Sequence, residues 1–442
     1  MQNLNYRDIN QEVIRTLSPP GKIYWFFVAL CFSGILYGAA CWAYQILTGM
    51  GSAGINIPVV WGIYLVNFVF WVGIAHSGTL ISAILFLFRA PWRTAIARSA
   101  EAMTVFAVMI AGLFPFIHLG RVWIFYWILP YPNQRDLWPN FQSPLLFDMV
   151  AITTYLTVSF LFWYTGMIPD LAALRDHSTG KQRKIYGFFS LGWMGSHHQW
   201  RHYGTSYLLL AALATPLVVS VHSVVSWDFA LAIVPGWHST IFAPYFVAGA
   251  IHSGLAMVLT LLIPLRRIYK FENFISLDIL ENIAKTMIFM ALIIGYSYTV
   301  EYFMAWYSGT MIERDTFLWR AIGHYAPQFW IMVMLNAVVP LLFFYKKIRT
   351  SIGWLFGIAI LVNIGMWYER FVIIVGSMAH SYIPHEWRLY RPTWVELGVM
   401  LGSFSIFFFL FLLFAKFLPS ISITEIKESL QPPVRDRGSK RK

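Results

Sequence analysis

Charged residues are scarce in this chain, and cysteines are scarcer still. Asp, Glu, Lys and Arg make up only 12% of the 442 residues, whereas apolar types make up 58%. Soluble globular domains carry about 25% charged residues, so this composition excludes a chain that is solvated over most of its surface. Apolar runs of about twenty residues recur, and each is long enough to cross a bilayer as a helix. The composition therefore predicts an all-α, polytopic membrane protein.

The two cysteines are too few for cysteine-based metal chemistry. Cys31 and Cys41 lie in one apolar run, and the chain has no CxxC pair and no set of four cysteines. Residues ten apart on one helix cannot form a disulfide, and an iron–sulfur cluster or a structural zinc ion needs more ligands. We expect both cysteines to be small core residues and no metal to be bound.

Long polar segments are also missing. The longest connection between apolar runs, residues 169–203, is short and basic, so a large soluble catalytic domain has no place in the chain. The first 22 residues are polar and precede an apolar run too long for a signal peptide, so we expect the first span to be retained. The net charge of +12 comes from basic loops, which membrane topology explains without nucleic acid.

Hydropathy predicts ten membrane-spanning helices. Pro58, Pro144 and Pro327 fall near helix starts, where the missing N–H group costs little. The predicted spans are 23–48, 58–88, 97–129, 144–168, 204–226, 240–264, 278–307, 325–345, 352–375 and 393–418.

Lysine and arginine alternate between the two sides of this arrangement. On one side, basic clusters occur within residues 7–22, 89–98, 175–201, 266–270, 346–349 and 435–442. On the other side, the loops at 49–57 and 227–239 contain neither residue type. Because short basic loops stay in the cytoplasm, this pattern supports ten spans and places both termini there. We expect the tail after Lys416 to be a cytoplasmic extension that is mobile or docked on a partner.

An internal repeat divides the chain. Residues 73–78 read Gly-Ile-Ala-His-Ser-Gly and residues 249–254 read Gly-Ala-Ile-His-Ser-Gly, each followed by an arginine, Arg89 or Arg266. Four helices per copy preserve orientation, which predicts two parallel four-helix bundles and two peripheral helices. The predicted units are residues 1–57 with the first peripheral helix, 58–226 and 227–375 as the two bundles, and 376–442 with the last helix and the tail.

The stretch from Glu101 to Tyr155 concentrates ionisable residues in apolar helices. His118 and Asp148 lie in the outer halves of two successive spans, and Arg121 follows His118 by one turn. Pro115 is expected to kink the helix and open a pocket. A histidine, a carboxylate and a nearby arginine around an apolar cleft suit a quinol, whose oxidation releases two protons with two electrons. Arg121 is therefore a further candidate for binding the substrate. The alternative is that the pair only satisfies helix contacts.

The second copy of the repeat lacks this pair. Tyr298 aligns with His118, and Ile331 aligns with Asp148. An asymmetric pair in a symmetric scaffold predicts one site, in the first bundle.

Other intramembrane polar residues are candidates for a proton path. They are His76, Glu101, His252, Glu281 and Glu301. For the two histidines, helix packing among small neighbours and, less strongly, haem ligation are the competing interpretations.

Two further polar features are expected to have structural roles. Glu369 and Arg370 are interpreted as a clamp, and the loop from His197 to His202 as a contact for lipid headgroups and a neighbouring subunit.

Several motifs resemble one known family. The duplicated Gly-x-x-His-Ser-Gly segment with its arginine, the run Phe-Pro-Phe-Ile-His-Leu-Gly-Arg at 114–121 and Ser-Pro-Leu-Leu-Phe-Asp at 143–148 are similar to the NrfD/polysulfide-reductase membrane subunits. The ten spans and the Pro-, Asn- and Trp-rich turn at 131–142 resemble the ActC-type subunits of bacterial alternative complex III. The likeness covers nearly the whole chain.

The resemblance implies a function. Such a subunit sits in the bacterial inner membrane and oxidises a quinol, typically menaquinol, near the periplasmic face, with His118 and Asp148 at the quinol-contacting positions. It binds no cofactor of its own. Electrons pass to a periplasmic iron–sulfur protein and then to a multihaem cytochrome c that holds haem c, beside a paralogous NrfD-like membrane subunit, and proton translocation is proposed for the family.

Other functions stay open from the residues alone. Parallel repeats with midplane histidines also occur in secondary transporters, although no matching pair of Gly/Pro-interrupted spans is present here. A di-haem cytochrome b anchor and a purely structural anchor of a redox complex are further alternatives.

Overall fold

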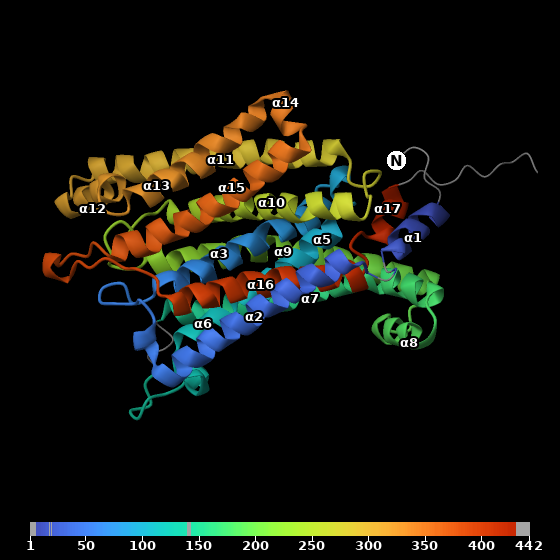
Figure 1. Cartoon of the computed structure of the whole chain (residues 1–442), viewed down its shortest axis with the longest axis horizontal. Coiled ribbons are helices and arrows are strands. Elements are labelled where there is room, and N and C mark those ends of the chain that lie inside the picture. Colours follow the sequence, from blue (N-terminus) through green and yellow to red (C-terminus); the bar gives the residue numbers. More distant parts are fainter. Residues whose placement is uncertain (1–5, 17, 19, 139–142, 430–442) are drawn as a thin grey trace, which may run out of the picture.

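The computed structural model describes residues 6–16, 18, 20–138 and 143–429, and in these residues all regular structure is helical (Figure 1). The elements are α1 (Tyr6–Arg15), α2 (Lys22–Thr48), α3 (Gly62–Thr79), η2 (Leu80–Ile84), α4 (Leu85–Leu87), α5 (Ala97–Ala111), α6 (Leu113–His118), η4 (Val122–Ile128), α7 (Pro144–His177), α8 (Gly180–Phe189), α9 (His197–Ala230), α10 (Phe242–Ile268), α11 (Leu277–Tyr307), α12 (Met311–Ile322), α13 (Ala326–Val333), η6 (Met334–Val338), η7 (Val339–Phe344), α14 (Lys346–Arg349), α15 (Ile352–Phe371), η8 (Val372–Gly376), α16 (Trp394–Phe417) and α17 (Ile423–Ser429).

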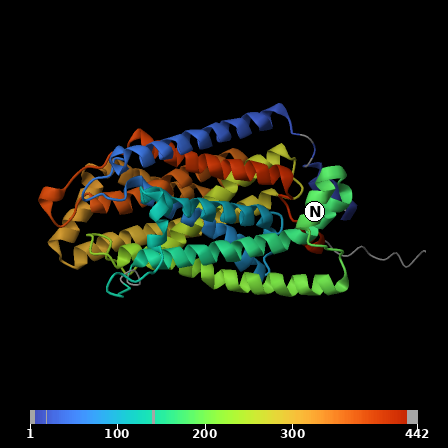
Figure 2. The same ribbon diagram turned by 90° about the horizontal axis from the view of Figure 1, so that it is seen from below.

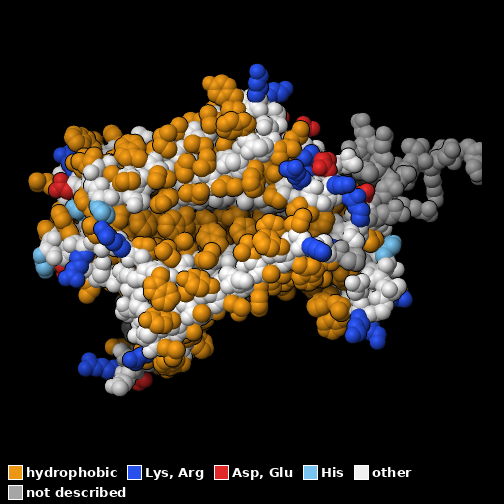
Figure 3. All heavy atoms as spheres, in the orientation of Figure 1, with side chains coloured by type: hydrophobic (Ala, Val, Ile, Leu, Met, Phe, Trp, Pro, Cys, Tyr) orange, Lys and Arg blue, Asp and Glu red, His pale blue; other side chains and the backbone are white. Residues whose placement is uncertain are grey.

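Nine helices in the described part of the chain are long and apolar enough to cross a membrane. α11, with 31 residues, has the length but is not among the nine. Nine of the ten predicted spans overlap one of these nine helices, and the span 278–307 overlaps α11. The predicted all-α, multi-pass membrane class is confirmed. Figure 3 shows hydrophobic side chains across the middle of one face, as a surface in contact with lipid tails requires.

The long helices run roughly parallel, so the molecule has two ends (Figures 1 and 2). α1, α8 and α17 lie at one end, which we call the terminal end. α6 and the loops after α2 and α9 lie at the opposite, distal end.

The two copies of the repeat meet at the centre. α3 and α10 carry the repeated segments and are the most buried of the nine helices. The small residues of each copy pack against the other: a Cβ on Gly73 would lie 3.4 Å from the Ser253 Oγ, and one on Gly254 would overlap Ser77. The small residues therefore serve helix packing, since they let the two backbones approach closely. The predicted division into two bundles at 57, 226 and 375 stays a prediction.

α2 and α16 pack along one side of the molecule (Figure 2). Gly38 and Gly402 bring the two backbones into contact, because a Cβ on Gly402 would lie 2.9 Å from the Gly38 Cα. Much of α2 faces outward, with Trp25, Phe26 and Leu30 exposed.

The structure corrects the predicted helix over 97–129. α5 ends at Ala111, the residue whose carbonyl the ring of Pro115 would displace, and α6 resumes for only six residues. Gly120, with φ +67°, then turns the chain away. The last part of the predicted span is the separate helix η4.

Two other expectations need correction. Residues 197–202 open α9 behind a capping box of Ser196 and Gln199, so they belong to a helix rather than a loop. After Lys416 the chain turns back, and residues from Ser420 to Ile426 are buried against this chain's own helices rather than extending freely. The basic tail beyond residue 429 and residues 139–142 of the predicted turn lie outside the described residues.

Candidate functional site

A cavity of about 440 Å³ lies between α3, α5, α6 and α7. Its wall is mainly aliphatic and aromatic, and only a few polar side chains, among them Tyr64, His118 and Asp148, line it. Such a cavity is typical of a site for a small, mostly apolar organic molecule. The lining residues are Trp61, Tyr64, Leu65, Phe68, Val108, Met109, Gly112, Leu113, Phe114, Pro115, Phe116, His118, Leu119, Ile128, Leu145, Asp148, Met149, Ile152, Thr153 and Leu156.

His118 is held at the cavity by aromatic rings. It is the last residue of α6, and its imidazole stacks on the indole of Trp61 with ring centroids 4.1 Å apart and planes at 22°. Tyr64 approaches the same ring edge-on at 6.2 Å. The His118 Nδ1 atom is buried and has no hydrogen-bond partner among the described residues. An imidazole fixed in this way has one ring nitrogen available to a ligand.

Asp148 lies on α7 and is only 4% exposed. Its carboxyl group has the Asp228 carboxyl, in the last turn of α9, as a neighbour. Neither Asp148 oxygen has a hydrogen-bond partner in the described structure. Two neighbouring buried carboxyl groups disfavour a second negative charge, so this pair can exchange protons with a ligand.

The structure thus brings His118 and Asp148 to one cavity, but it leaves Arg121 outside. Arg121 is exposed and lies beyond the turn at Gly120, so it no longer shares a helical face with His118. Its predicted contact with substrate has no geometric support.

His76 lies deeper in the bundle, beside a histidine that the sequence analysis did not consider. The rings of His76 and His222 are 4.4 Å apart, and both side chains are buried. The His76 Nε2 and both ring nitrogens of His222 have no hydrogen-bond partner in the described part of the chain. Tyr155 approaches His76 at 5.9 Å and donates a hydrogen bond to the Ala75 carbonyl.

Glu101 belongs to a buried ionic cluster at the terminal end. It accepts hydrogen bonds from the Arg98 guanidinium at 3.0 Å and the Tyr207 hydroxyl at 2.9 Å. The same hydroxyl is 2.9 Å from Glu425 of α17, which also pairs with Arg93 at 3.0 Å. The C-terminal segment therefore supplies one carboxylate of this cluster.

The remaining predicted proton-path residues are dispersed. His252 is buried with both ring nitrogens unpartnered among the described residues. Glu301 is buried near the far end of α11. Glu281 instead pairs with Arg349 at 2.9 Å and Lys285 at 3.1 Å near the start of that helix.

Glu369 and Arg370 form a buried pair at 3.1 Å, as a clamp requires. Glu369 also accepts hydrogen bonds from the Tyr298 hydroxyl and the Asn336 amide. Tyr298, which aligns with His118 in the internal repeat, therefore belongs to a different polar network, with Glu369 and Asn336.

No group of three or more His, Cys, Asp or Glu side chains that could hold a metal ion occurs in the residues that the structure describes. Cys31 and Cys41 are free thiols.

Asp228 and His222 were missed for different reasons. Asp228 lies two residues beyond the predicted end of its span and therefore counted as a loop residue. His222 lies six residues before Asp228 in the same helix. It is an ionisable residue in an apolar run, and this signal in the sequence could have identified it.

Comparison with known proteins places the chain in a family. Residues 51–380 match the family described as polysulphide reductase, NrfD. The chain is 26% identical over 407 residues to the membrane subunit of a putative dimethyl sulfoxide reductase of Halobacterium salinarum, covering 84% of this chain and 86% of that protein. It is 23% identical over 248 residues to one of the subunits of the selenate reductase of Mesobacillus selenatarsenatis, covering 53% and 55%. The match over residues 51–380 shows that this chain belongs to the NrfD family.

Proposed function

We propose that the cavity between α3, α5, α6 and α7 binds a quinol, and that this chain is the quinol-oxidising membrane subunit of a respiratory redox complex. The observation that carries the proposal is the placement of His118 and Asp148 at one apolar cavity, each with a buried polar atom that the protein itself does not engage. The named relatives are subunits of reductases, which supports a role within a larger redox complex.

The chemistry requires two proton acceptors. Oxidation of a quinol to a quinone releases two electrons and two protons, one from each hydroxyl group. The His118 Nδ1 accepts one proton, and the carboxyl pair of Asp148 and Asp228 accepts the other. The apolar wall binds the ring and the isoprenoid chain.

The electrons then leave the chain. We infer that they pass at the distal end to an iron–sulfur protein and on to a multihaem cytochrome c with haem c, in a complex of the alternative complex III type with a paralogous NrfD-like subunit. Menaquinol is the inferred substrate. The basic residues at the terminal end favour cytoplasmic termini in a bacterial inner membrane, so the cavity would face the periplasm.

A proton path through the first bundle would start at Glu101. Thr104, one turn along α5, donates a hydrogen bond to the Ala75 carbonyl at 2.8 Å, and Tyr155 donates to the same oxygen at 3.0 Å. His76 directly follows Ala75 in the chain. These hydroxyl groups support the proposal that Glu101 and His76 relay protons. The proton transfer would be coupled to quinol oxidation.

Asp148→Asn in the purified complex tests the site. An amide cannot accept the proton, so the rate of quinol oxidation should fall by about 100-fold. Asp176→Asn removes an exposed carboxylate at the other end of the same helix and serves as the matched control. A wild-type rate in an assembled Asp148→Asn complex would refute the assignment.

A further inference from the structure

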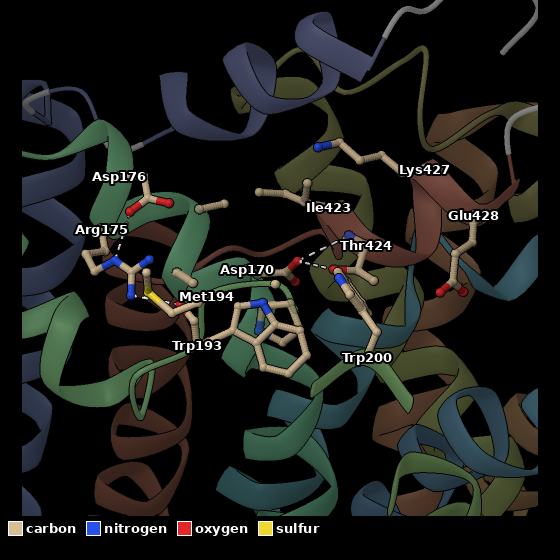
Figure 4. Close-up of a pocket in the computed structure, with 14 residues that line it drawn as sticks. Asp170, Arg175, Asp176, Trp193, Met194, Trp200, Ile423, Thr424, Lys427 and Glu428 are labelled. Carbon is tan, nitrogen blue, oxygen red and sulfur yellow. Dashed lines mark hydrogen bonds and ion pairs between the residues drawn. The ribbon is translucent and has the colours of Figure 1, made fainter. Parts of the chain in front are cut away.

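A second pocket, of about 500 Å³, opens at the terminal end (Figure 4). It is lined by the last turns of α7, whereas the proposed quinol cavity is lined by the first turns of that helix. Its walls come from the last turns of α7, the loop between α8 and α9, the first turn of α9 and the C-terminal helix α17. The pocket is therefore formed between α17, the last described helix, and elements from the first half of the chain.

Most charged groups in the wall are already paired. The fully buried Asp170 accepts hydrogen bonds from Arg98 at 3.2 Å and from the Thr424 hydroxyl at 3.0 Å. Arg175 donates to Asp176 at 2.8 Å and to the Trp193 carbonyl at 2.9 Å. These groups shape the pocket but have little capacity left for a ligand.

Lys427 and Glu428 are the exceptions. Both line the pocket from α17, and within the described residues neither makes a hydrogen bond or an ion pair. Partial desolvation lowers the pKa of Lys427 and raises the pKa of Glu428, although Asp170 and Arg93 respectively oppose these shifts. Each group would therefore still gain from a partner of opposite charge in direct contact. A cation and a carboxylate at the same pocket, neither with a direct hydrogen-bond or ion-pair partner in the described residues, are complementary to a ligand that carries both charges.

The residues around this pocket indicate that it lies at the level of the lipid headgroups in the membrane. Trp193 and Trp200 meet edge-to-face at 5.0 Å in the wall, and tryptophan favours the membrane interface. The adjacent helix α8 combines Lys181, Arg183 and Lys184 with exposed apolar residues, of which Phe188 is 75% exposed. That combination is typical of a helix lying in the interface.

An apolar surface leads out of the pocket. Met194 lines the pocket and is 79% exposed, and Leu191 and Phe188 precede it in the chain with large exposed side chains. An acyl chain could follow these residues away from the charged groups.

We propose that this pocket binds a phospholipid whose headgroup carries a phosphate and a primary ammonium group. The phosphate contacts Lys427, the ammonium contacts Glu428 beside the indoles, and the acyl chains lie along Met194 and α8. The lipid then links α17 to α7 and α9, and so helps to hold Glu425 in the buried cluster with Glu101.

Lipid titration of the delipidated, full-length protein, read by native mass spectrometry, tests this site. Phosphatidylethanolamine should bind about fivefold more tightly than phosphatidylglycerol, which has no ammonium group. Phosphatidylcholine, whose ammonium cannot donate a hydrogen bond, should bind more weakly than phosphatidylethanolamine. Glycerophosphoethanolamine, which lacks acyl chains, should compete poorly.

Variants assign the two charges. Glu428→Gln should abolish the preference for phosphatidylethanolamine over phosphatidylglycerol, whereas Lys427→Gln should weaken both lipids alike. Lys184→Gln, on α8 and outside the pocket wall, is the control and should keep the preference.

Equal binding of the three lipids to the wild-type protein would overturn the proposal, and so would a preference retained in Glu428→Gln. Stronger binding of phosphatidylglycerol would also overturn it and would instead assign the surface to anionic lipid through α8. The wild-type comparison decides the question even if a variant fails to fold.

Discussion

At the scale of single residues, the cavity that we propose for a quinol depends on how its two polar side chains, His118 and Asp148, are placed. His118 ends a six-residue helix and has little backbone support beyond it, because Gly120 turns the chain away. Its orientation therefore relies on the stacked ring of Trp61. Asp148 has no hydrogen-bond partner within the described residues and has the Asp228 carboxyl as a neighbour.

Trp61→Ala should reduce quinol turnover even though the residue carries no proton. Loss of an aromatic pair is worth about 1 kcal/mol, so we expect kcat/KM for quinol to fall by about fivefold to tenfold. Trp61→Phe keeps an aromatic face and should retain most of the activity. Steady-state kinetics with a soluble quinol analogue measure kcat/KM for both variants. Equal kcat/KM values for Trp61→Ala and Trp61→Phe would show that stacking on His118 has no role.

At the scale of elements, close backbone contact holds the peripheral helices together. Gly402 permits the contact of α16 with α2, whereas Gly357 of α15 has open space around its Cα. The two positions allow a matched comparison on membrane helices.

Gly402→Ala should destabilise the protein, and Gly357→Ala should not. The new methyl group at residue 402 meets the Gly38 backbone, and such overpacking costs about 1–3 kcal/mol. At residue 357 the same change removes only the conformational entropy cost of glycine in a helix. Thermal unfolding in detergent compares the two, and a similar loss of Tm in both would contradict close α2–α16 packing.

The segment after η8 should be sensitive to acid. His380 stacks on Trp387 at 3.9 Å, and burial lowers its pKa from the ordinary value. Because the folded state favours neutral imidazole, this stabilisation is present above about pH 6.5 and is lost as the pH falls below it.

Limited proteolysis of residues 381–393 between pH 7.5 and 5 measures this effect. Cleavage should increase toward pH 5 in the wild-type protein. His380→Phe, which retains a ring for stacking but cannot be protonated, should show a flatter profile. An identical rise in both proteins would assign the pH dependence to other groups.

At the scale of the whole molecule, the two ends differ in what they carry. The terminal end holds α1, α17 and the buried cluster of Arg93, Arg98, Glu101 and Glu425 (Figure 1). The quinol cavity lies toward the distal end. This separation would keep proton uptake and proton release on opposite sides of the membrane.

Both termini should be cytoplasmic. Green fluorescent protein fused after Lys442 should fluoresce, and alkaline phosphatase at the same point should be inactive, because the basic connections are retained on that side. Fusions within the loop at 231–241 should show the opposite pattern. An active phosphatase at the C-terminus would invert the orientation and place the quinol cavity toward the cytoplasm.

The sequence by itself determined the helical membrane class, the positions of the long helices and the two candidate side chains. Both signals are local in the sequence. An apolar helix in a bilayer satisfies its own backbone hydrogen bonds, and an ionisable residue in such a helix can be recognised without knowing which residues pack against it.

Only the tertiary structure decided which distant residues share a site. Asp228 meets Asp148 from 80 residues away, and Glu425 joins Glu101 across more than 300. Local pattern carries no information on such pairs, because their proximity follows from how the helices pack. The position of Arg121 is a similar case, since the turn at Gly120 overrides the helical periodicity that would place Arg121 beside His118.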